Sequence, residues 1–261
     1  MEAGEMPAVT LAGDISVPVI GFGTWQLQGK QGYQAVRLAL EAGYRHIDTA
    51  TMYGNEDEVG RALRDSGLDR REVFITTKAP PSSAGRERET IAASLRALGV
   101  DYVDLWLVHW PPAGRAAPPM WREFLTVRDR GLARAIGVSN YRTDQIDELI
   151  NATGQAPAVN QIPWSPSQHD PRRLAESRDR GVLVEGYSPL KGTHLRDRTL
   201  VGIAEEHEVT VPQVVLRWHI QHGIPVIPKS SDPGRIRENF DLSDFSLSDQ
   251  EMDRIDGLST E

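Results

Sequence analysis

Four side chains that can move a proton stand at or near the ends of three strand-like runs of the sequence. An acid, a phenol, an amine and an imidazole are groups that enzymes use for proton transfer. If the runs are parallel strands of a barrel, their carboxyl ends share one rim, where catalytic residues gather. The four residues are Asp48 and Tyr53 within Tyr44–Glu56, Lys78 at the end of Val73–Lys78, and His109 at the end of Val103–His109.

Together these side chains can act as a general acid and the groups that tune it. A tyrosine near its ordinary pKa of ~10 donates a proton poorly at neutral pH. We expect the Lys78 ammonium to lower the pKa of Tyr53, and Asp48 to keep Lys78 charged and oriented. His109 would hydrogen-bond a substrate carbonyl oxygen. Each residue alone has a structural interpretation, as a turn cap, a packed phenol, a surface charge or a core histidine. Only their joint placement favours catalysis.

Composition limits the classes of protein to consider. The chain has 261 residues, 39% hydrophobic and 25% charged, with a net charge of -8. Because phosphate binding needs a basic face, this acidic balance argues against a nucleic-acid partner. There is no cysteine, so we expect no disulfide, no thiolate metal site and no cysteine nucleophile, and we expect no metal. Residues 1–9 are too short and acidic for a signal peptide, and no apolar run approaches the ~20 residues that span a bilayer. We expect a cytoplasmic monomer that does not contact membranes.

Strand-like runs alternate with helical patterns along the chain, which implies parallel strands joined by helical crossovers. Eight such units predict one α/β domain over residues 1–261, a closed (β/α)8 TIM barrel. An open doubly wound sheet is the rival, but its glycine-rich turn would fall at Gly21–Gln26, which lacks the third glycine. The strand runs are 19–25, 45–50, 73–78, 103–109, 133–140, 159–162, 182–188 and 225–229. The helical patterns are 31–42, 56–65, 86–98, 120–130, 143–151, 171–180, 198–221, 232–239 and 247–257.

Local signals complete the predicted fold. Val9–Pro18 has the pattern of a β-hairpin with a Gly-Asp turn, placed to close the bottom of the barrel. Thr143 or Asp144 is expected to cap the helix that follows it. Residues 110–119 form a proline-rich loop rather than a linker, because the barrel pattern resumes after them.

The sequence as a whole resembles the aldo-keto reductase family. The resemblance runs from about Val9 to Leu258, with six motifs in the family's order. These are Gly43–Ala50, Tyr53–Glu56, Val108–Pro111, Gly137–Asn140, Asn160–Ile162, and Ile227–Ser230 with Arg235, Glu238 and Asn239. Among bacterial members it looks most like those that reduce keto-sugar acids such as 2,5-diketogluconate.

The resemblance implies an NADPH-dependent reductase of small aldehydes or ketones. Tyr53 would be the general acid of a tetrad with Asp48, Lys78 and His109. Residues expected at the nicotinamide end of the cofactor are Gly23, Thr24, Trp25, Asp48, Ser139, Asn140, Gln161 and Tyr187. Those expected at the pyrophosphate are Ser188, Leu190, Lys191 and Gly192. Those expected at the 2′-phosphate and adenine are Lys229, Ser230, Arg235, Glu238 and Asn239.

A physical argument supports the expected 2′-phosphate site. Lys229 and Arg235 bring two positive charges to the start of a helix near Asp232, and helix N-termini attract phosphate. An arginine at this place favours NADP over NAD. Asp232 would weaken that preference if it pointed at the phosphate, but we expect it to cap the helix instead.

The sequence departs from the commoner family pattern in two places. After Gln161 it reads Ile162–Pro166, where relatives often have an acidic residue and a histidine. It ends at Glu261, where many relatives continue with a tail over the active site. With the short loop 110–119, this predicts a more open and less selective substrate pocket than in those relatives. Its contacts would come from His109 and from the bulky apolar side chains of Trp25, Met52 and Trp110.

Two other functions remain open from the sequence. One is a Schiff-base barrel lyase that uses Lys78, which the neighbouring acid and phenol and the cofactor motifs oppose. The other is an NADP(H)-binding sensor with a reductase fold, which the complete tetrad opposes.

Overall fold

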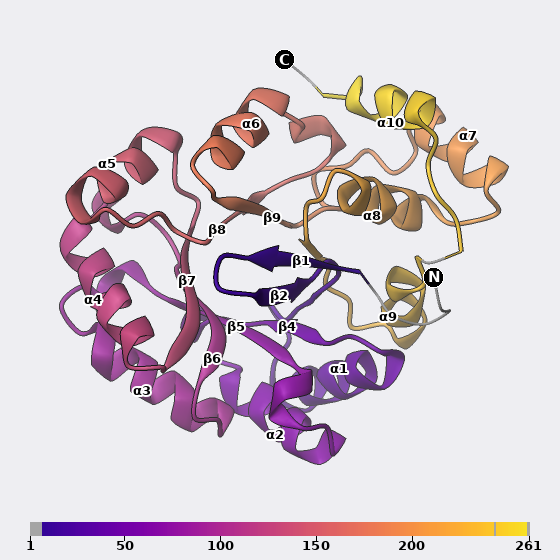
Figure 1. Ribbon diagram of the computed structural model, residues 1–261. Helices are drawn as coiled ribbons and strands as arrows, with labels where there is room; N and C mark the ends of the chain where they lie inside the picture. The colour runs from indigo at the N-terminus through magenta and orange to yellow at the C-terminus, as the bar shows by residue number, and fades with distance from the viewer. Residues whose placement is uncertain (1–6, 243, 260–261) are drawn as a thin grey trace.

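The computed structural model describes residues 7–242 and 244–259. Within this part of the chain, eight parallel strands form one barrel with helices around it, as Figure 1 shows. This confirms the predicted (β/α)8 TIM barrel. Residues 1–6, where the absence of a signal peptide was expected, lie outside the described residues. The strands are β3 (Phe22–Gly23), β4 (His46–Asp48), β5 (Phe74–Ala79), β6 (Val103–Val108), β7 (Ala133–Ser139), β8 (Val159–Pro163), β9 (Leu183–Tyr187) and β10 (Val226–Ile227).

The barrel closes where its first and last strands meet. Ile20 forms a parallel bridge with Val226, and the Gly21 amide donates to the Val226 carbonyl at 2.8 Å. The Val226 amide in turn donates to the Val19 carbonyl at 2.9 Å. These bonds leave no open edge between β3 and β10, which rules out the open doubly wound sheet. The first strand is shorter than the predicted run 19–25 because only Phe22–Gly23 pairs continuously with β4.

The N-terminal hairpin lies across the bottom of the barrel, as predicted. Its strands β1 (Ala8–Leu11) and β2 (Ile15–Pro18) pair antiparallel, and Figure 1 shows them across the end of the barrel that faces the viewer. Leu11 and Ile15 pack in one buried cluster with Phe74 and Val159, the first residues of β5 and β8. The opposite end, where the strands finish, therefore holds the site.

The outer helices follow the predicted order with one exception. The pattern 198–221 is two helices rather than one, because Pro212 cannot donate an amide hydrogen bond within a continuous helix. Thr210 and Gln213 form a capping box that starts the second helix there. The helices are α1 (Gly29–Ala42), α2 (Glu56–Ser66), α3 (Glu87–Leu98), α4 (Pro118–Asp129), α5 (Thr143–Thr153), α6 (Pro171–Asp179), α7 (Arg198–Glu206), α8 (Val211–Gln221), α9 (Pro233–Phe240) and α10 (Asp249–Asp256). None of the described helices is long and apolar enough to cross a bilayer.

Of the two predicted helix caps, the structure confirms one and contradicts the other. Asp232 caps α9, since its Oδ1 accepts a hydrogen bond from the Arg235 amide at 2.9 Å. At α5 the prediction of Thr143 or Asp144 is wrong. The helix already includes Thr143, and the Gln145 side chain accepts from the Arg142 amide at 2.9 Å instead. Thr143 turns outward to donate to Glu176 on α6 at 2.8 Å.

At Gly60 the backbone of α2 lies close against the end of α3. A β-carbon at this position would lie 2.4 Å from the Leu98 carbonyl oxygen, a backbone atom that cannot rotate away. We expect Gly60→Ala to lower the free energy of unfolding by about 1–3 kcal/mol, the usual cost of overpacking. Urea denaturation measures this change.

Gly202 in α7 is the matched control, because a β-carbon there would have no neighbour within 4 Å. Gly202→Ala should raise the stability by about 0.5–1 kcal/mol through the better helix propensity of alanine. If both variants change stability equally, the close approach at Gly60 is not what excludes a side chain.

Candidate active site

The four proton-transfer residues meet at the carboxyl end of the barrel. Asp48 is the last residue of β4, Lys78 lies near the end of β5, and His109 directly follows β6. Tyr53 ends a short 3-10 turn, Thr51–Tyr53, that returns the chain over the end of β4. The parallel register places Asp48 beside Thr76 and Lys78 beside Leu107, so each residue lies within two positions of the next one along the barrel rim.

Lys78 is the centre of this group. Its Nζ donates to Asp48 Oδ1 at 2.6 Å and to the Thr49 carbonyl at 2.9 Å, and it lies 3.4 Å from Tyr53 Oη. Burial is the largest single effect on Lys78 and lowers its pKa, but the charge and hydrogen bond of Asp48, with smaller contributions from Tyr53 and Glu185, together outweigh it, and the net pKa is raised. Lys78 therefore stays an ammonium. Its three protons point at a carboxylate, a carbonyl and the phenol oxygen.

The pKa of Tyr53 differs from the prediction in its net direction. Burial raises it, the Lys78 charge lowers it, and the Asp48 charge raises it again, so that the net pKa lies above 10.0. The expected effect of Lys78 is present. This effect is outweighed for two reasons. The phenol is largely buried, and Asp48 Oδ1, which lies 2.6 Å from Lys78 Nζ, offsets much of the ammonium's charge. The ground state of Tyr53 is thus a neutral phenol that carries its proton.

His109 stands beside Tyr53 as a neutral imidazole. The two rings meet edge to face, with centroids 5.6 Å apart. Burial, with a further contribution from the Lys78 charge, lowers the pKa of His109 to about 3. An imidazole without charge keeps one N–H donor at neutral pH and does not compete with Lys78 as a cation. His109 can therefore bind a carbonyl oxygen by a hydrogen bond.

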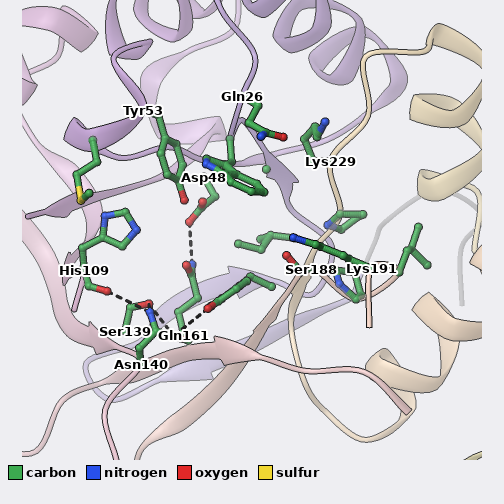
Figure 2. Close-up of a pocket in the computed structure, with 18 of the residues that line it drawn as sticks. Gln26, Asp48, Tyr53, His109, Ser139, Asn140, Gln161, Ser188, Lys191 and Lys229 are labelled. Carbon is green, nitrogen blue, oxygen red and sulfur yellow. Dashed lines mark hydrogen bonds between the residues drawn. The ribbon is translucent and has the colours of Figure 1, made fainter. Parts of the chain in front are cut away.

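A cavity of about 650 Å³ opens above these residues, a size typical of small-molecule sites. Figure 2 shows Tyr53 and His109 on one side of it and Lys191 and Lys229 on the other. The predicted site residues that line it are Gly23, Trp25, Asp48, Met52, Tyr53, His109, Trp110, Ser139, Asn140, Gln161, Tyr187, Ser188, Leu190, Lys191 and Lys229.

Three large apolar side chains on the cavity rim are exposed to solvent. Trp25, Met52 and Trp110 keep 45%, 59% and 46% of their surface accessible. Such residues are normally buried, and exposed apolar side chains that gather at one place mark a binding surface. Core packing, the alternative explanation for these residues, does not apply.

The floor of the cavity is a connected set of amides and hydroxyls from three strand ends. Tyr187 Oη donates to Asn140 Oδ1 at 2.8 Å, and Asn140 Nδ2 donates to the His109 carbonyl at 3.2 Å and to Ser139 Oγ at 2.9 Å. Gln161 Nε2 donates to two carboxylates, Asp48 Oδ2 at 2.8 Å and Glu185 Oε2 at 2.6 Å. With its amide protons engaged in this way, Gln161 keeps its side-chain oxygen as an acceptor for a ligand, and Asn140 Oδ1, which already accepts from Tyr187, has a second lone pair. These two acceptors fit the amide –NH2 of a nicotinamide ring.

The expected phosphate end lies at the start of α9. Lys229 and Arg235 are both exposed, and neither forms an ion pair with a described residue. Asp232 is engaged as the helix cap, so its carboxylate accepts a backbone amide hydrogen bond and forms no ion pair with either cation. Arg235 does not line the cavity, whereas Lys229 does. Two unpaired cations beside a helix N-terminus fit a phosphate group.

The remaining predicted residues do not line the cavity. Thr24 is buried, and its hydroxyl donates to the backbone carbonyl of Asp48 at 2.9 Å, which holds the end of β4 in place. Glu238 accepts from Thr210 on α8 at 2.8 Å, and Asn239 is buried in α9. Ser230 accepts from the Asp232 amide at 3.0 Å. Lys78 lies beneath the floor, and Gly192 packs against Ser165. Cofactor contacts of these residues stay predictions.

The site residues that the sequence analysis missed include Gln26 and Glu185, besides Pro189, Ile227 and Pro228 of the cavity lining. Gln26 lines the cavity with a left-handed φ of 65°, directly after the predicted Trp25. Glu185 is buried on β9 behind the tetrad. The second had a visible signal. It is a charged residue inside an apolar run and lies two positions before Tyr187, so both side chains face the inside of the barrel.

Glu185 is a second buried carboxyl group in the barrel, next to Asp48. Burial and the Asp48 charge raise its pKa from 4.5 to about 8. His46 Nε2 lies 3.8 Å from Glu185 Oε1, but burial lowers the pKa of His46 to about 3, so it supplies no cation. Among the described residues, the only buried positive charge near Glu185 is that of Lys78, which Asp48 already neutralises. Glu185 is therefore predominantly protonated at neutral pH.

This raised pKa predicts a pH dependence of stability. Between pH 4.5 and 8 the folded chain binds a proton at Glu185 that the unfolded chain has lost. The contribution is therefore fully present below pH 4.5 and is lost as the pH rises through about 8. Glu185→Gln has no such proton, so its stability should fall less over this range, by an amount on the order of a few kcal/mol. Urea denaturation of both proteins at several pH values measures the difference, and parallel curves would contradict a protonated Glu185.

Comparison with known proteins agrees with this geometry. The family model described as "Aldo/keto reductase family" matches residues 19–260. An aldo-keto reductase of Mycolicibacterium smegmatis is 44% identical over 97% of this chain and 94% of its own length. Morphine 6-dehydrogenase of Pseudomonas putida is 41% identical over 99% of this chain and 93% of its own.

Solved structures give the same result. An aldo/keto reductase from Brucella melitensis superposes with a TM-score of 0.94 at 41% identity, covering 98% of this chain and 100% of the other. A Bombyx mori aldo-keto reductase in complex with NADP superposes with a TM-score of 0.90 at 32% identity, covering 98% and 94%. A shared barrel, a full-length family match and relatives above 40% identity lead to one conclusion: the chain belongs to the aldo/keto reductase family of oxidoreductases.

Proposed function

We propose that this protein reduces aldehydes or ketones to alcohols with NADPH, and that Tyr53 supplies the proton. The observation that carries the proposal is the position of Tyr53 Oη. The phenol lines the cavity beside His109 and lies 3.4 Å from the buried Lys78 ammonium. A proton donor, a neutral hydrogen-bond donor and a fixed cation thus meet at one point on the cavity wall.

The protein's own groups prepare the carbonyl for reduction. The His109 imidazole orients the carbonyl oxygen towards the Tyr53 hydroxyl, which donates its proton as negative charge develops on that oxygen. The Lys78 ammonium then stabilises the phenolate that Tyr53 becomes, because it lies next to the phenol oxygen. Asp48 holds Lys78 in place throughout. The high ground-state pKa of Tyr53 matches this order, since the proton stays on the phenol until the substrate takes it.

The polar groups of the cavity and the two cations beside α9 support NADPH as the cofactor. When bound, it would supply the hydride that reduces the carbonyl carbon. The acceptor oxygens of Asn140 and Gln161 would hold the carboxamide, with Tyr187 against the ring. Lys229 and Arg235 would hold the 2′-phosphate. The Bombyx mori relative binds NADP.

The apolar rim favours substrates with a hydrophobic group next to the carbonyl. Trp25, Met52 and Trp110 offer apolar surface on the substrate side of Tyr53 and His109. Lys191 Nζ lies 5.5 Å from the Trp25 ring, so one wall carries a positive charge as well. The cytoplasmic location and the monomeric state stay predictions from the sequence.

The Schiff-base alternative fits the site poorly. An amine that attacks a carbonyl must be neutral and reach the substrate. Lys78 is buried, donates to two oxygens within 3.0 Å and has a raised pKa. The sensor alternative remains an outcome of the first experiment.

Tyr53→Phe removes the proposed acid while keeping the ring. We expect kcat for reduction of a small aldehyde to fall by about 10²–10⁴-fold, the usual contribution of a general acid, with little change in NADPH binding. Tyr33→Phe, which removes a hydroxyl bonded to Asp65 far from the cavity, is the control and should keep its rate. Consumption of NADPH, followed by absorbance, measures both. If the wild type turns over no carbonyl compound in a panel, the sensor function replaces this one. If Tyr53→Phe keeps most of its rate, another group is the acid.

Arg235→Ala tests the 2′-phosphate role. The loss of hydrogen bonds between two charged groups, worth about 1.5–3 kcal/mol, should raise KM for NADPH by roughly ten- to a hundredfold and leave KM for NADH nearly unchanged. Arg237, two residues further along the same helix and equally exposed, is the control. Arg237→Ala should affect neither cofactor. Equal effects of Arg235→Ala on NADPH and NADH would refute the assignment.

A further inference from the structure

A second group of ionisable side chains lies outside the barrel, among its C-terminal helices. His169 sits between the turn Pro166–Gln168 and α6, His222 directly follows α8, and Asp256 ends α10. None of the three lines the active-site cavity. The cluster joins segments that are far apart in the sequence, and the proposed reduction makes no use of it.

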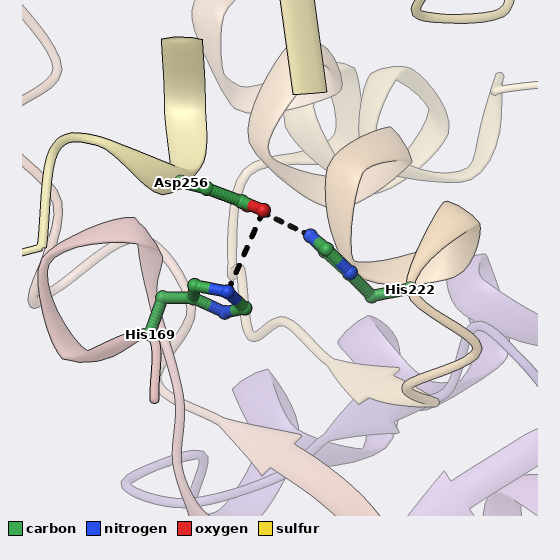
Figure 3. A group of neighbouring side chains, drawn as sticks. All are labelled: His169, His222 and Asp256. Carbon is green, nitrogen blue, oxygen red and sulfur yellow. Dashed lines mark hydrogen bonds and ion pairs between the residues drawn. The ribbon is translucent and has the colours of Figure 1, made fainter. Parts of the chain in front are cut away.

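The two imidazoles converge on one carboxylate. His222 Nε2 lies 2.8 Å from Asp256 Oδ1, and His169 Nε2 lies 3.5 Å from Asp256 Oδ2. Figure 3 shows the rings reaching the carboxylate from two sides. The rings are roughly parallel, with centroids 4.9 Å apart. One nitrogen from each imidazole and one carboxylate oxygen all lie within 4.8 Å of one another.

The surroundings would support a bound ion as well. Trp218 Nε1 donates to Asp256 Oδ1 at 2.7 Å and so fixes the carboxylate from outside the cluster. Ligand residues in metal sites are commonly oriented by such outer hydrogen bonds. The Trp164 and Trp218 rings pack edge-on against His169. The side chain of His169 is 6% exposed, while His222 and Asp256 are 21% and 29% exposed. An ion could therefore enter past the partly exposed side chains of His222 and Asp256.

From these contacts we propose that His169, His222 and Asp256 form a binding site for a divalent transition-metal ion of the zinc class. Two imidazoles and one carboxylate suit zinc, cobalt or nickel, whereas magnesium and calcium require oxygen ligands. Ligand atoms at ~2.0–2.2 Å from a tetrahedral ion lie about 3.3–3.6 Å apart. The contacts with Asp256 are 2.8 and 3.5 Å and the three ligand atoms lie within 4.8 Å of one another, so side-chain rotations complete the site. Water from the exposed side fills the fourth position.

Metal binding would require little chemical change in the cluster. A neutral imidazole coordinates through a nitrogen lone pair, so the proton that His222 shares with Asp256 moves to the other ring nitrogen. The bound ion would link α10 to α8 and to the segment before α6, which stabilises the last helix against opening.

The test uses the full chain without a histidine tag. Zinc is titrated by calorimetry and cobalt by its visible ligand-field spectrum, and the melting temperature is measured with and without zinc. We expect one zinc per chain, a cobalt spectrum of a low-coordinate nitrogen and oxygen site, and a rise of several degrees on zinc addition. His222→Gln and Asp256→Asn should each weaken zinc binding by roughly tenfold or more and abolish the rise.

His207→Gln is the matched control. His207 makes a similar contact with Glu251 on the same helix, at 2.7 Å, but has no second imidazole beside it. This variant should bind zinc as the wild type does. Carbonyl reduction reports whether each variant is folded, because none of the substituted residues lines the active-site cavity. If the His222 and Asp256 variants do not fold, the wild-type cobalt spectrum and stoichiometry still decide. The proposal is overturned if the wild type binds no zinc, or if folded variants at His222 and Asp256 bind it equally well.

Discussion

The ion pair between Lys78 and Asp48 is the interaction on which the mouth of the barrel depends. Taking two charges out of water costs several kcal/mol for each ion, and their attraction offsets this only when the remaining hydrogen bonds are made. Here the Thr49 carbonyl accepts a further hydrogen bond from the Lys78 ammonium, and the Gln161 amide donates one to the Asp48 carboxylate. The ends of β4, β5 and β8 are therefore held together, and the proton-donating phenol of Tyr53 rests against a cation that cannot move away.

The same constraint explains the charge state of the groups around this pair. One buried cation can neutralise one buried carboxylate, and Asp48 takes that place at 2.6 Å. Glu185, which shares the Gln161 amide, keeps its proton, while His46 and His109 remain uncharged because burial lowers the pKa of both to about 3. The interior of the site thus has no net charge before a cofactor binds. Any positive charge that meets the cofactor's phosphates comes from the exposed rim.

Much of this arrangement could be predicted from the order of residues. Alternating strand and helix patterns specify a parallel barrel, and in such a barrel the position of Asp48, Lys78 and His109 at strand ends places them together. Local chemistry was also readable, as with the Asp232 cap. The errors came where several local signals compete. Apolar spacing alone predicts one helix over 198–221, but the chain is divided there by Thr210, Pro212 and Gln213. At the start of α5 it is the side chain of Gln145, rather than that of Thr143 or Asp144, that caps the helix.

The sequence by itself determined which residue types reach the barrel mouth, because strand periodicity and chain order decide which side chains face inward and where each strand ends. The tertiary structure decided how strongly each group is buried and how far it lies from its neighbours. These two quantities set the net pKa of Tyr53 above its ordinary value and kept Glu185 protonated. They also brought His169, His222 and Asp256 together from three separate elements. Burial and distance arise from packing between segments remote in sequence, so no local pattern contains them.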